Sequence, residues 1–486
     1  MDLTTYFSQR QPLRAAEREL VRRWVKRPSL LKRHELDALR YAIAVAQLGT
    51  VRARNREVDV FEDVAPYRHW LIEQLAYFVQ PGGEDRVDWR GVRQLLPAVC
   101  GRVRAVRGHV LERGLLSMDR FEREVTHKQL VLVLGGGGGS GYAHLGALAF
   151  VDDLGLTPNL IVGASMGALI GLFRSERREF DPVTTALALP RPSEWSRVFS
   201  PYRGTSSFGF PGTIELKART IGTEIFERLI GRTIPRVTDL AIPYRAVVTG
   251  LRTGIGLALS DVERRIERSR RSGRTGRVNR NLSLFFGTVK KMLENPRLLE
   301  EIVFGGDEGL RDVNAVDAMG FSCAVPGIIH YDVHEPDDPT AVQLRELFAE
   351  RRIFRLTDGG IVSNVPARVA YETVARGDLG YRNAFFLAFD AFAPVFNKNA
   401  AFIPVQQLVR RSVLVNRPYC DHLVTLRQPP PPFQLLQSLD TLQRVMSRTR
   451  RQLESERAFV DAMTRPIPRW PLLERALDMP PEPTDD

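Results

Sequence analysis

Three short runs hold, in a fixed order along the chain, the residue types that hydrolysis of an acyl ester needs. They are Gly135–Gly141, a glycine loop interrupted by Ser140; Gly163–Gly167, which carries Ser165; and Asp358-Gly359-Gly360. Amides freed by glycine can stabilise an oxyanion, a serine hydroxyl can attack a carbonyl carbon, and a carboxylate can take the serine proton. Together they indicate ester cleavage that needs no histidine.

The serine run has the surroundings of a nucleophile on a sharp turn. Apolar residues 160–162 precede it and residues 168–173 follow it, which predicts a strand, a tight turn and a helix. Gly163 and Gly167 let the backbone bend and let neighbouring elements approach. A Gly-x-Ser-x-Gly run arises by chance about once in six chains of this size, so its position carries the interpretation. The alternative is a helix start that only packs.

The glycine loop has three interpretations. Its spacing matches a dinucleotide fingerprint, but the next strand runs into the serine run without an acidic residue for a ribose. A phosphate-binding P-loop requires a lysine, and this loop has none. The third interpretation alone uses the nearby serine: an oxyanion hole formed by backbone amides of Gly136, Gly137, Gly138, Gly139, Ser140 and Gly141.

A serine nucleophile needs a base, and two candidates follow it in sequence. Among eight histidines only His422 comes after Asp358, as the serine, acid, histidine order of α/β-hydrolases requires. Asp358 ends an apolar strand and enters a glycine turn, so we expect its carboxylate at the same sheet edge as Ser165. Asp358 is the expected base; a structural turn aspartate and a triad through His422 are the alternatives.

These three runs resemble the motifs of the patatin-like phospholipase family: Gly-x-Gly-x-x-Gly, Gly-x-Ser-x-Gly and Asp-Gly-Gly/Ala. Residues 142–146 and 318–327 are also similar to stretches of that family. The resemblance covers about residues 129–393. It implies Ser165 as nucleophile, Asp358 as base, glycine-loop amides as oxyanion donors, an acyl-enzyme intermediate and no calcium. His144 would then be structural.

One position departs from the family pattern. Family members usually carry Arg or Lys just before the last glycine of the loop, where this chain has Ser140. The missing cation puts the level of activity in doubt, although the backbone donors remain.

Composition restricts the class of protein and its partners. The 486 residues are 43% apolar and carry a net charge of +12, with 7 Lys against 62 Arg. Such a charge attracts anionic membranes, unless the arginines are simply solvated, and the absence of interleaved aromatic and basic residues argues against nucleic acid. Three dispersed cysteines form no metal knuckle or disulfide framework. No secretion signal is visible, so we expect a cytoplasmic, peripherally membrane-associated protein.

Short apolar runs separated by glycine turns and helical stretches predict an α/β fold with a central, mostly parallel sheet. The expected strands are Leu130–Leu134, Leu160–Val162, Tyr244–Val248, Ile353–Leu356 and Ala384–Phe389. The resemblance implies a patatin-like layered fold. We expect residues 1–127 as an N-terminal helical domain, 128–395 as the hydrolase domain with a basic insertion at about 254–314, and 396–486 as a helical extension with a proline-rich tail.

Two further features suggest surface roles. Arg14, Arg18, Arg22 and Arg23 form an arginine-rich face that could dock on a membrane or a partner, the alternative being a solvated helix face. Residues 261–304 form a candidate lid.

In the C-terminal extension, the apolar stripe Leu435, Leu439, Leu442, Met446 and Leu453 predicts one packed helix face.

The sequence therefore predicts a lipid acyl hydrolase of phospholipase A or lysophospholipase type, acting on phospholipid or lysophospholipid without metal or cofactor. Two alternatives stay open. One is a catalytically weak patatin fold that binds lipid or acts as a scaffold. The other is transfer of the acyl group to an alcohol, because an acyl-enzyme does not specify its acceptor.

Overall fold

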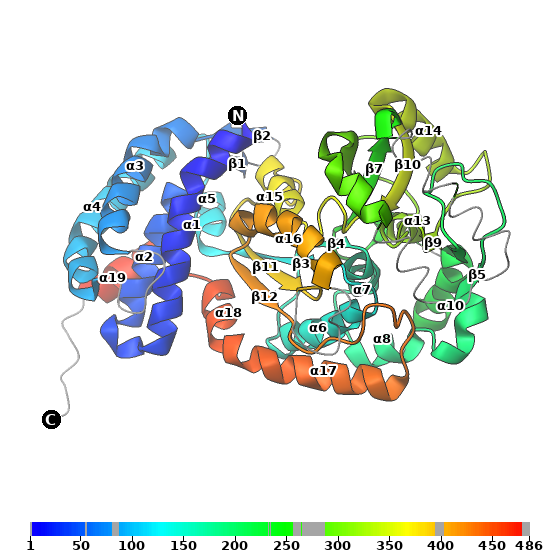
Figure 1. The fold of residues 1–486 in the computed structure, drawn as a ribbon. Coiled ribbons are helices and arrows are strands. Elements are labelled where there is room, and N and C mark those ends of the chain that lie inside the picture. The colour runs from blue at the N-terminus through cyan, green and yellow to red at the C-terminus, as the bar shows by residue number, and fades with distance from the viewer. Residues whose placement is uncertain are drawn as a thin grey trace. The chain divides into compact units, whose positions relative to one another are not determined.

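The computed structural model describes residues 2–478 apart from 54–55, 80–86, 232, 234, 256–263, 265–286 and 394–402. The chain forms two compact units (Figure 1). The helical unit comprises residues 1–130, 371–385 and 455–486, and the sheet unit comprises residues 131–370 and 386–454. The three-domain division made from the sequence stays a prediction. No helix in the described part of the chain is both long and apolar enough to cross a membrane.

The helical unit consists mainly of antiparallel and crossing helices. They are α1 (Leu3–Lys26), α2 (Arg33–Ala46), α3 (Phe61–Phe78), α4 (Trp89–Glu112), α5 (Met118–Thr126), α18 (Arg457–Thr464) and α19 (Trp470–Asp478), with α15 (Ala367–Arg376) entering from the sheet unit. A hairpin that the sequence analysis missed, β1 (Thr50–Ala53) and β2 (Arg56–Asp59), interrupts them. Its strands are four residues long, too short to show a clear alternation.

Three arginines of the arginine-rich face of α1 contact other side chains within the helical unit. The Arg14 guanidinium lies over the Tyr371 ring and is 8% exposed, and that of Arg22 lies over the Phe459 ring. Arg23 pairs with Glu19 at 2.6 Å. Ring faces and a carboxylate within the unit therefore contact these three side chains, and docking through this face stays a prediction.

A central, mostly parallel sheet organises the sheet unit, as the sequence predicted. Its strand order is β10-β7-β4-β3-β11-β12, with β8 also paired to β7. The bounds are β3 (Gln129–Leu134), β4 (Leu160–Ala164), β7 (Tyr244–Arg252), β8 (Leu299–Phe304), β10 (Ile353–Asp358), β11 (Ala384–Asp390) and β12 (His422–Thr425). All five expected strands are confirmed. A small second sheet holds β5 (Phe199–Pro201), β6 (Ile214–Leu216) and β9 (Ile329–His330).

β8 and β10 both pair with β7 in antiparallel fashion. β4 pairs with β7 in parallel, with Ala164 opposite Val247, whereas β10 pairs with β7 antiparallel, with Asp358 opposite Val248. β7 extends four residues beyond Val248, so β10 runs back along it and ends level with the end of β4. Asp358 thus reaches the height of Ser165 through the register of an antiparallel pair.

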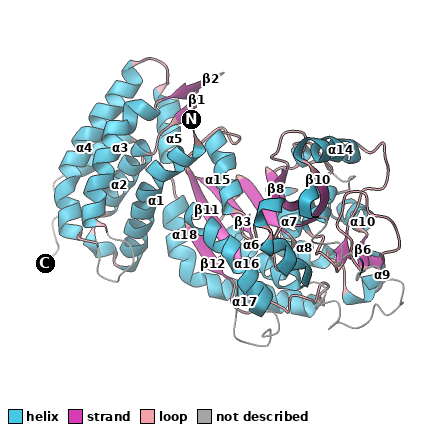
Figure 2. Cartoon of the chain, turned by 45° about the horizontal axis from the view of Figure 1, so that its top comes forward, coloured by secondary structure: helices cyan, strands magenta, loops and turns pink. Residues whose placement is uncertain are grey.

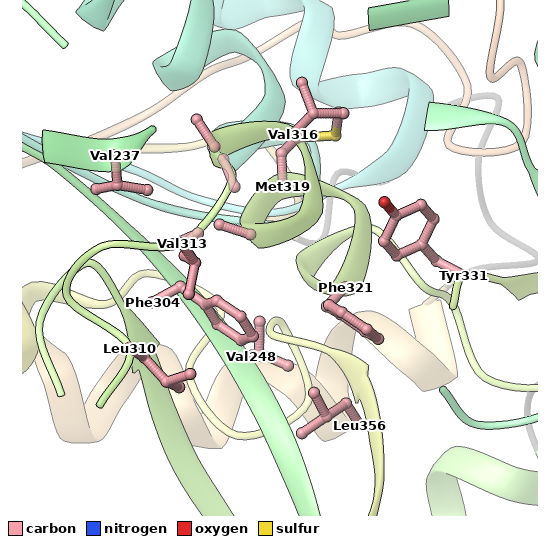
Figure 3. Packing of buried hydrophobic residues seen from close by; sticks show 14 of the residues in the cluster. Val237, Val248, Phe304, Leu310, Val313, Val316, Met319, Phe321, Tyr331 and Leu356 are labelled. Carbon is pink, nitrogen blue, oxygen red and sulfur yellow. The ribbon is translucent and has the colours of Figure 1, made fainter. Parts of the chain in front are cut away.

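Helices lie around the two sheets of this unit (Figure 2). They are α6 (Ala143–Asp153), α7 (Met166–Ser175), α8 (Pro182–Ala188), α9 (Trp195–Val198), α10 (Ala218–Ile230), α13 (Ala315–Ser322), α14 (Pro339–Arg351), α16 (Ile403–Asn416) and α17 (Leu439–Leu453). α7 packs on β4 and β7, α13 on β7 and β10, and α17 on α6. In the core beneath α13, Phe321 packs with Phe304, Val248 and Leu356 (Figure 3). This core holds the end of α13 against the strands that carry the candidate site.

Two sequence-based expectations change in the sheet unit. Most of the candidate lid lies outside the described residues, and its last part, Leu299–Phe304, is strand β8. The C-terminal apolar stripe is helical only from Leu439 onward; Leu435 precedes α17 and was wrongly assigned to that helix face. The helix begins after Ser438, whose backbone is extended and whose hydroxyl caps the first turn by accepting from the Thr441 amide.

Candidate active site

Ser165 lies on the sharp turn between β4 and α7. Its backbone adopts φ 52° and ψ −127°, a left-handed conformation that is strained for a residue with a Cβ. The Ser165 amide donates to Oγ of Ser322 at 2.9 Å, and that hydroxyl donates to the Val247 carbonyl at 2.6 Å. Ser322, at the end of α13, thereby ties the strained turn to the middle of β7.

Close backbone contacts explain two of the motif glycines. A Cβ on Gly167 would lie 2.1 Å from the Leu134 carbonyl oxygen, and one on Gly359 would lie 1.9 Å from the Val247 carbonyl oxygen. Neither contact is possible for a real side chain, and the atoms met are backbone. These glycines let α7 approach β3 and let the turn after β10 approach β7. Both approaches bring the ends of β4 and β10 together.

The side chains of Ser165 and Asp358 meet at these ends. Oγ of Ser165 donates to Oδ2 of Asp358 at 2.6 Å, and the Gly360 amide donates to Oδ1 at 2.8 Å. Both side chains are nearly buried, at 5% and 7% exposure. Burial raises the pKa of the Asp358 carboxyl to about 6, although hydrogen bonds from Ser165 and Gly360 act to lower it. A carboxylate in this state can accept the serine proton near neutral pH.

Some amides of the glycine loop already donate to a carbonyl, and others have no acceptor in the described part of the chain. Gly136 donates to the Asn364 carbonyl at 3.0 Å, Gly139 to the Pro432 carbonyl at 2.7 Å, and Ser140 to the Gly137 carbonyl at 3.1 Å. The amides of Gly137 and Gly138 have no acceptor within the described part of the chain, and both residues border the same cavity as Ser165. Gly141 is buried against Met166.

Two apolar cavities meet at Ser165. The first is bordered by Asp358, Asn364, Phe392 and Pro432. The second extends along α7 and α10 and is lined by residues such as Leu172, Ile225 and Met319. Gly138, Ser165, Val325, Ile329 and Leu435 border both. Their largely apolar walls suit hydrocarbon groups.

Histidine does not contribute to this centre in the described structure. No histidine in the described ranges lines either cavity. His422 begins β12, three strands from β4, or about 14 Å away across the sheet. His144 is fully buried, with Nε2 2.7 Å from the Gly135 carbonyl oxygen, and burial lowers its pKa to about 4. It is therefore neutral and holds the start of the glycine loop. The described residues also contain no His, Cys, Asp or Glu group able to hold a metal ion.

Sequence reasoning missed three contributors. Ser322 lies in the family-like stretch 318–327, but that stretch showed no role for its hydroxyl. Asn364, six residues after Asp358, is 3% exposed and borders the first cavity. Residues 428–437, between β12 and α17, border both cavities through Leu435. A proline run in a C-terminal extension carries no catalytic signal of its own.

Comparisons with known proteins point to one family. Residues 132–371 match the family model described as Patatin-like phospholipase. The neuropathy target esterase sws of Drosophila grimshawi is 30% identical over 134 residues, which are 27% of this chain and 9% of that protein. The neuropathy target esterase sws of Drosophila melanogaster is 29% identical over 134 residues, which are again 27% of this chain and 9% of that protein. The aligned segment thus spans about a tenth of the curated relatives.

Proposed function

Because this chain carries a patatin-like phospholipase domain over residues 132–371, we propose that it hydrolyses acyl esters of lipids, with phospholipid or lysophospholipid as substrate. The observation that carries the proposal is the 2.6 Å hydrogen bond from Ser165 Oγ to the Asp358 carboxyl, at the junction of two apolar cavities.

In the first half-reaction, Asp358 takes the proton of Ser165 as Oγ attacks the ester carbonyl carbon. The amides of Gly137 and Gly138 stabilise the tetrahedral oxyanion. The intermediate collapses to an acyl-enzyme, and the proton on Asp358 passes to the departing alkoxide, which leaves as an alcohol. Asp358 is then ionised again.

In the second half-reaction, Asp358 takes a proton from water as the water oxygen attacks the acyl carbon. The same two amides stabilise the second oxyanion. The carbon–Oγ bond breaks, the proton returns to Ser165, and the fatty acid departs. A carboxylate with a pKa of about 6 suits both directions of proton transfer, because this value lies near the working pH.

The cavities favour a lipid substrate. Apolar walls on both sides of Ser165 can hold an acyl chain on one side and a hydrophobic part of the leaving group on the other. The net charge of +12 supports peripheral contact with an anionic membrane surface. Sedimentation with anionic, but not zwitterionic, vesicles at low salt would test this contact.

The central experiment compares Ser165→Ala and Asp358→Asn with Ser175→Ala. Ser175 lies on the same helix as the nucleophile turn, is equally buried, and its hydroxyl has no hydrogen-bond partner in the described structure. On a short-chain ester and on a phospholipid panel, the first two variants should lose about a thousandfold or more, and Ser175→Ala should keep wild-type turnover. Wild-type activity equal to that of Ser165→Ala would reject the proposal.

Two further measurements separate the alternatives. A fluorophosphonate probe should label the wild type at Ser165, whereas a lipid-binding protein with an inert serine would stay unlabelled. His422→Gln should keep kcat, because β12 lies three strands from β4; loss of turnover would favour a histidine triad. Products formed with and without an added alcohol distinguish hydrolysis from acyl transfer.

A further inference from the structure

Residues 428–437, here called the proline segment, cross the glycine loop although they lie outside the family-matched range 132–371. The segment connects β12 to α17 and contains Pro429–Pro432. Four consecutive prolines have carbonyl acceptors but no amide donors, and their φ angles are restricted. The run is thus stiff before it packs, and it offers acceptors only.

Two residues of the loop, and Tyr142 just after it, donate hydrogen bonds to this segment. Ser140 Oγ donates to the Pro430 carbonyl at 2.8 Å, the Gly139 amide donates to the Pro432 carbonyl at 2.7 Å, and Tyr142 Oη donates to the Leu435 carbonyl at 2.8 Å. Ser140 and Tyr142 are 1% and 3% exposed. These three donor residues follow closely after Gly137 and Gly138, the two loop residues whose amides have no acceptor in the described part of the chain.

The fit leaves no space for a side chain at Gly138 or Gly139. A Cβ on Gly138 would lie 2.5 Å from the Pro432 carbonyl oxygen, and one on Gly139 would lie 2.4 Å from the Gln434 carbonyl oxygen. Gly138 also has φ +52°. A run of glycines samples many backbone conformations when unsupported. The proline segment is therefore the outer surface against which this loop holds one conformation.

We propose that the proline segment is a positioning element of the oxyanion hole, and that Ser140 is its principal anchor at the position where related sequences usually carry a cation. The inference rests on the proposed hydrolase function. Oxyanion donors act only when they are oriented before the reaction, and the three hydrogen bonds orient Gly137 and Gly138. Leu435 also borders both cavities, so the same segment contributes to the walls that hold the substrate.

The test uses two substitutions that remove anchoring hydroxyls, Ser140→Ala and Tyr142→Phe, in the full chain. Each should lower kcat on a soluble ester by about 10- to 100-fold with little change in KM, because an ester in its ground state carries no oxyanion. Ser140→Thr, which keeps a hydroxyl, should recover most of the loss. Tyr67→Phe removes a similar hydroxyl-to-carbonyl contact in the helical unit and should leave kcat unchanged.

A second readout separates positioning from general stability. A trifluoromethyl ketone forms a tetrahedral oxyanion with an active serine, so its affinity should fall by the same factor as kcat in Ser140→Ala and Tyr142→Phe. If both variants melt at lower temperature but keep kcat and ketone affinity, the positioning role is overturned while the hydrolase function stands. An inactive wild type would instead refute the proposed function itself.

Discussion

The backbone amide of Ser165 donates a hydrogen bond to Oγ of Ser322 at 2.9 Å, across 157 positions of sequence. Because Ser322 also donates to the Val247 carbonyl, one hydroxyl connects the strained turn to the strand that separates β4 from β10. This connection fixes the Ser165 turn relative to Asp358, since Asp358 pairs with the residue after Val247.

Ser322→Ala should therefore damage both stability and turnover. The buried Ser165 amide loses its acceptor, which costs about 1–3 kcal/mol in the free energy of unfolding. The relaxed turn moves Oγ, so kcat should fall while KM stays near its wild-type value. Urea unfolding and steady-state kinetics on a soluble ester measure the two effects. A variant with wild-type stability and kcat would show that the turn holds its conformation without Ser322.

The pH dependence of the reaction should follow Asp358. Only the ionised carboxylate can take the serine proton, and the pKa of this group is raised to about 6. The value of kcat/KM should therefore fall about tenfold per pH unit below pH 6 and level off above it. A profile that stays flat down to pH 4.5 would contradict Asp358 as the base.

Asp358→Asn should stabilise the fold while it removes activity. The folded-state pKa of about 6 lies above the value of 3.8 for an exposed aspartate. Between these values the folded protein binds the extra proton, so stability falls as the pH rises, and the full penalty applies above pH 6. The asparagine variant lacks this penalty and should gain about 1–3 kcal/mol in free energy of unfolding at pH 8.

The check is denaturant unfolding of both proteins at several pH values. The advantage of the asparagine variant should shrink between pH 6 and pH 4, because the wild-type carboxyl is then protonated in the folded state. An advantage that is independent of pH would mean that ionisation of Asp358 is not its source.

Two glycine substitutions should have opposite effects. Gly359→Ala places a Cβ 1.9 Å from the Val247 carbonyl oxygen, so β10 must separate from β7, at a cost of about 3 kcal/mol or more. Gly101→Ala, inside α4, meets nothing within 4 Å and should stabilise by up to about 1 kcal/mol. Thermal unfolding compares them directly. Equal melting temperatures would refute the close contact at Gly359.

Local pattern alone was enough for much of this protein. The apolar runs around Ser165 and before Asp358 predicted β4, α7 and β10, because strand, turn and helix signals lie within a few residues of one another. The order of the three motifs predicted the family, and apolar runs alternating with helical stretches predicted a central, mostly parallel sheet. The short hairpin β1–β2 was missed, and Leu435 was placed on a helix that begins only at Leu439.

Tertiary structure decided how the site is assembled. The sequence shows which residues can act as nucleophile and carboxylate, but strand direction and register, set by packing across β7, bring Asp358 level with Ser165. Likewise, every glycine in the loop has an amide, but only the folded chain shows which of these amides already donate a hydrogen bond. Only the folded chain shows that Ser140 Oγ donates to the Pro430 carbonyl and that the Gly139 amide donates to the Pro432 carbonyl. Such contacts join residues almost 300 positions apart, beyond the range over which sequence periodicity carries information.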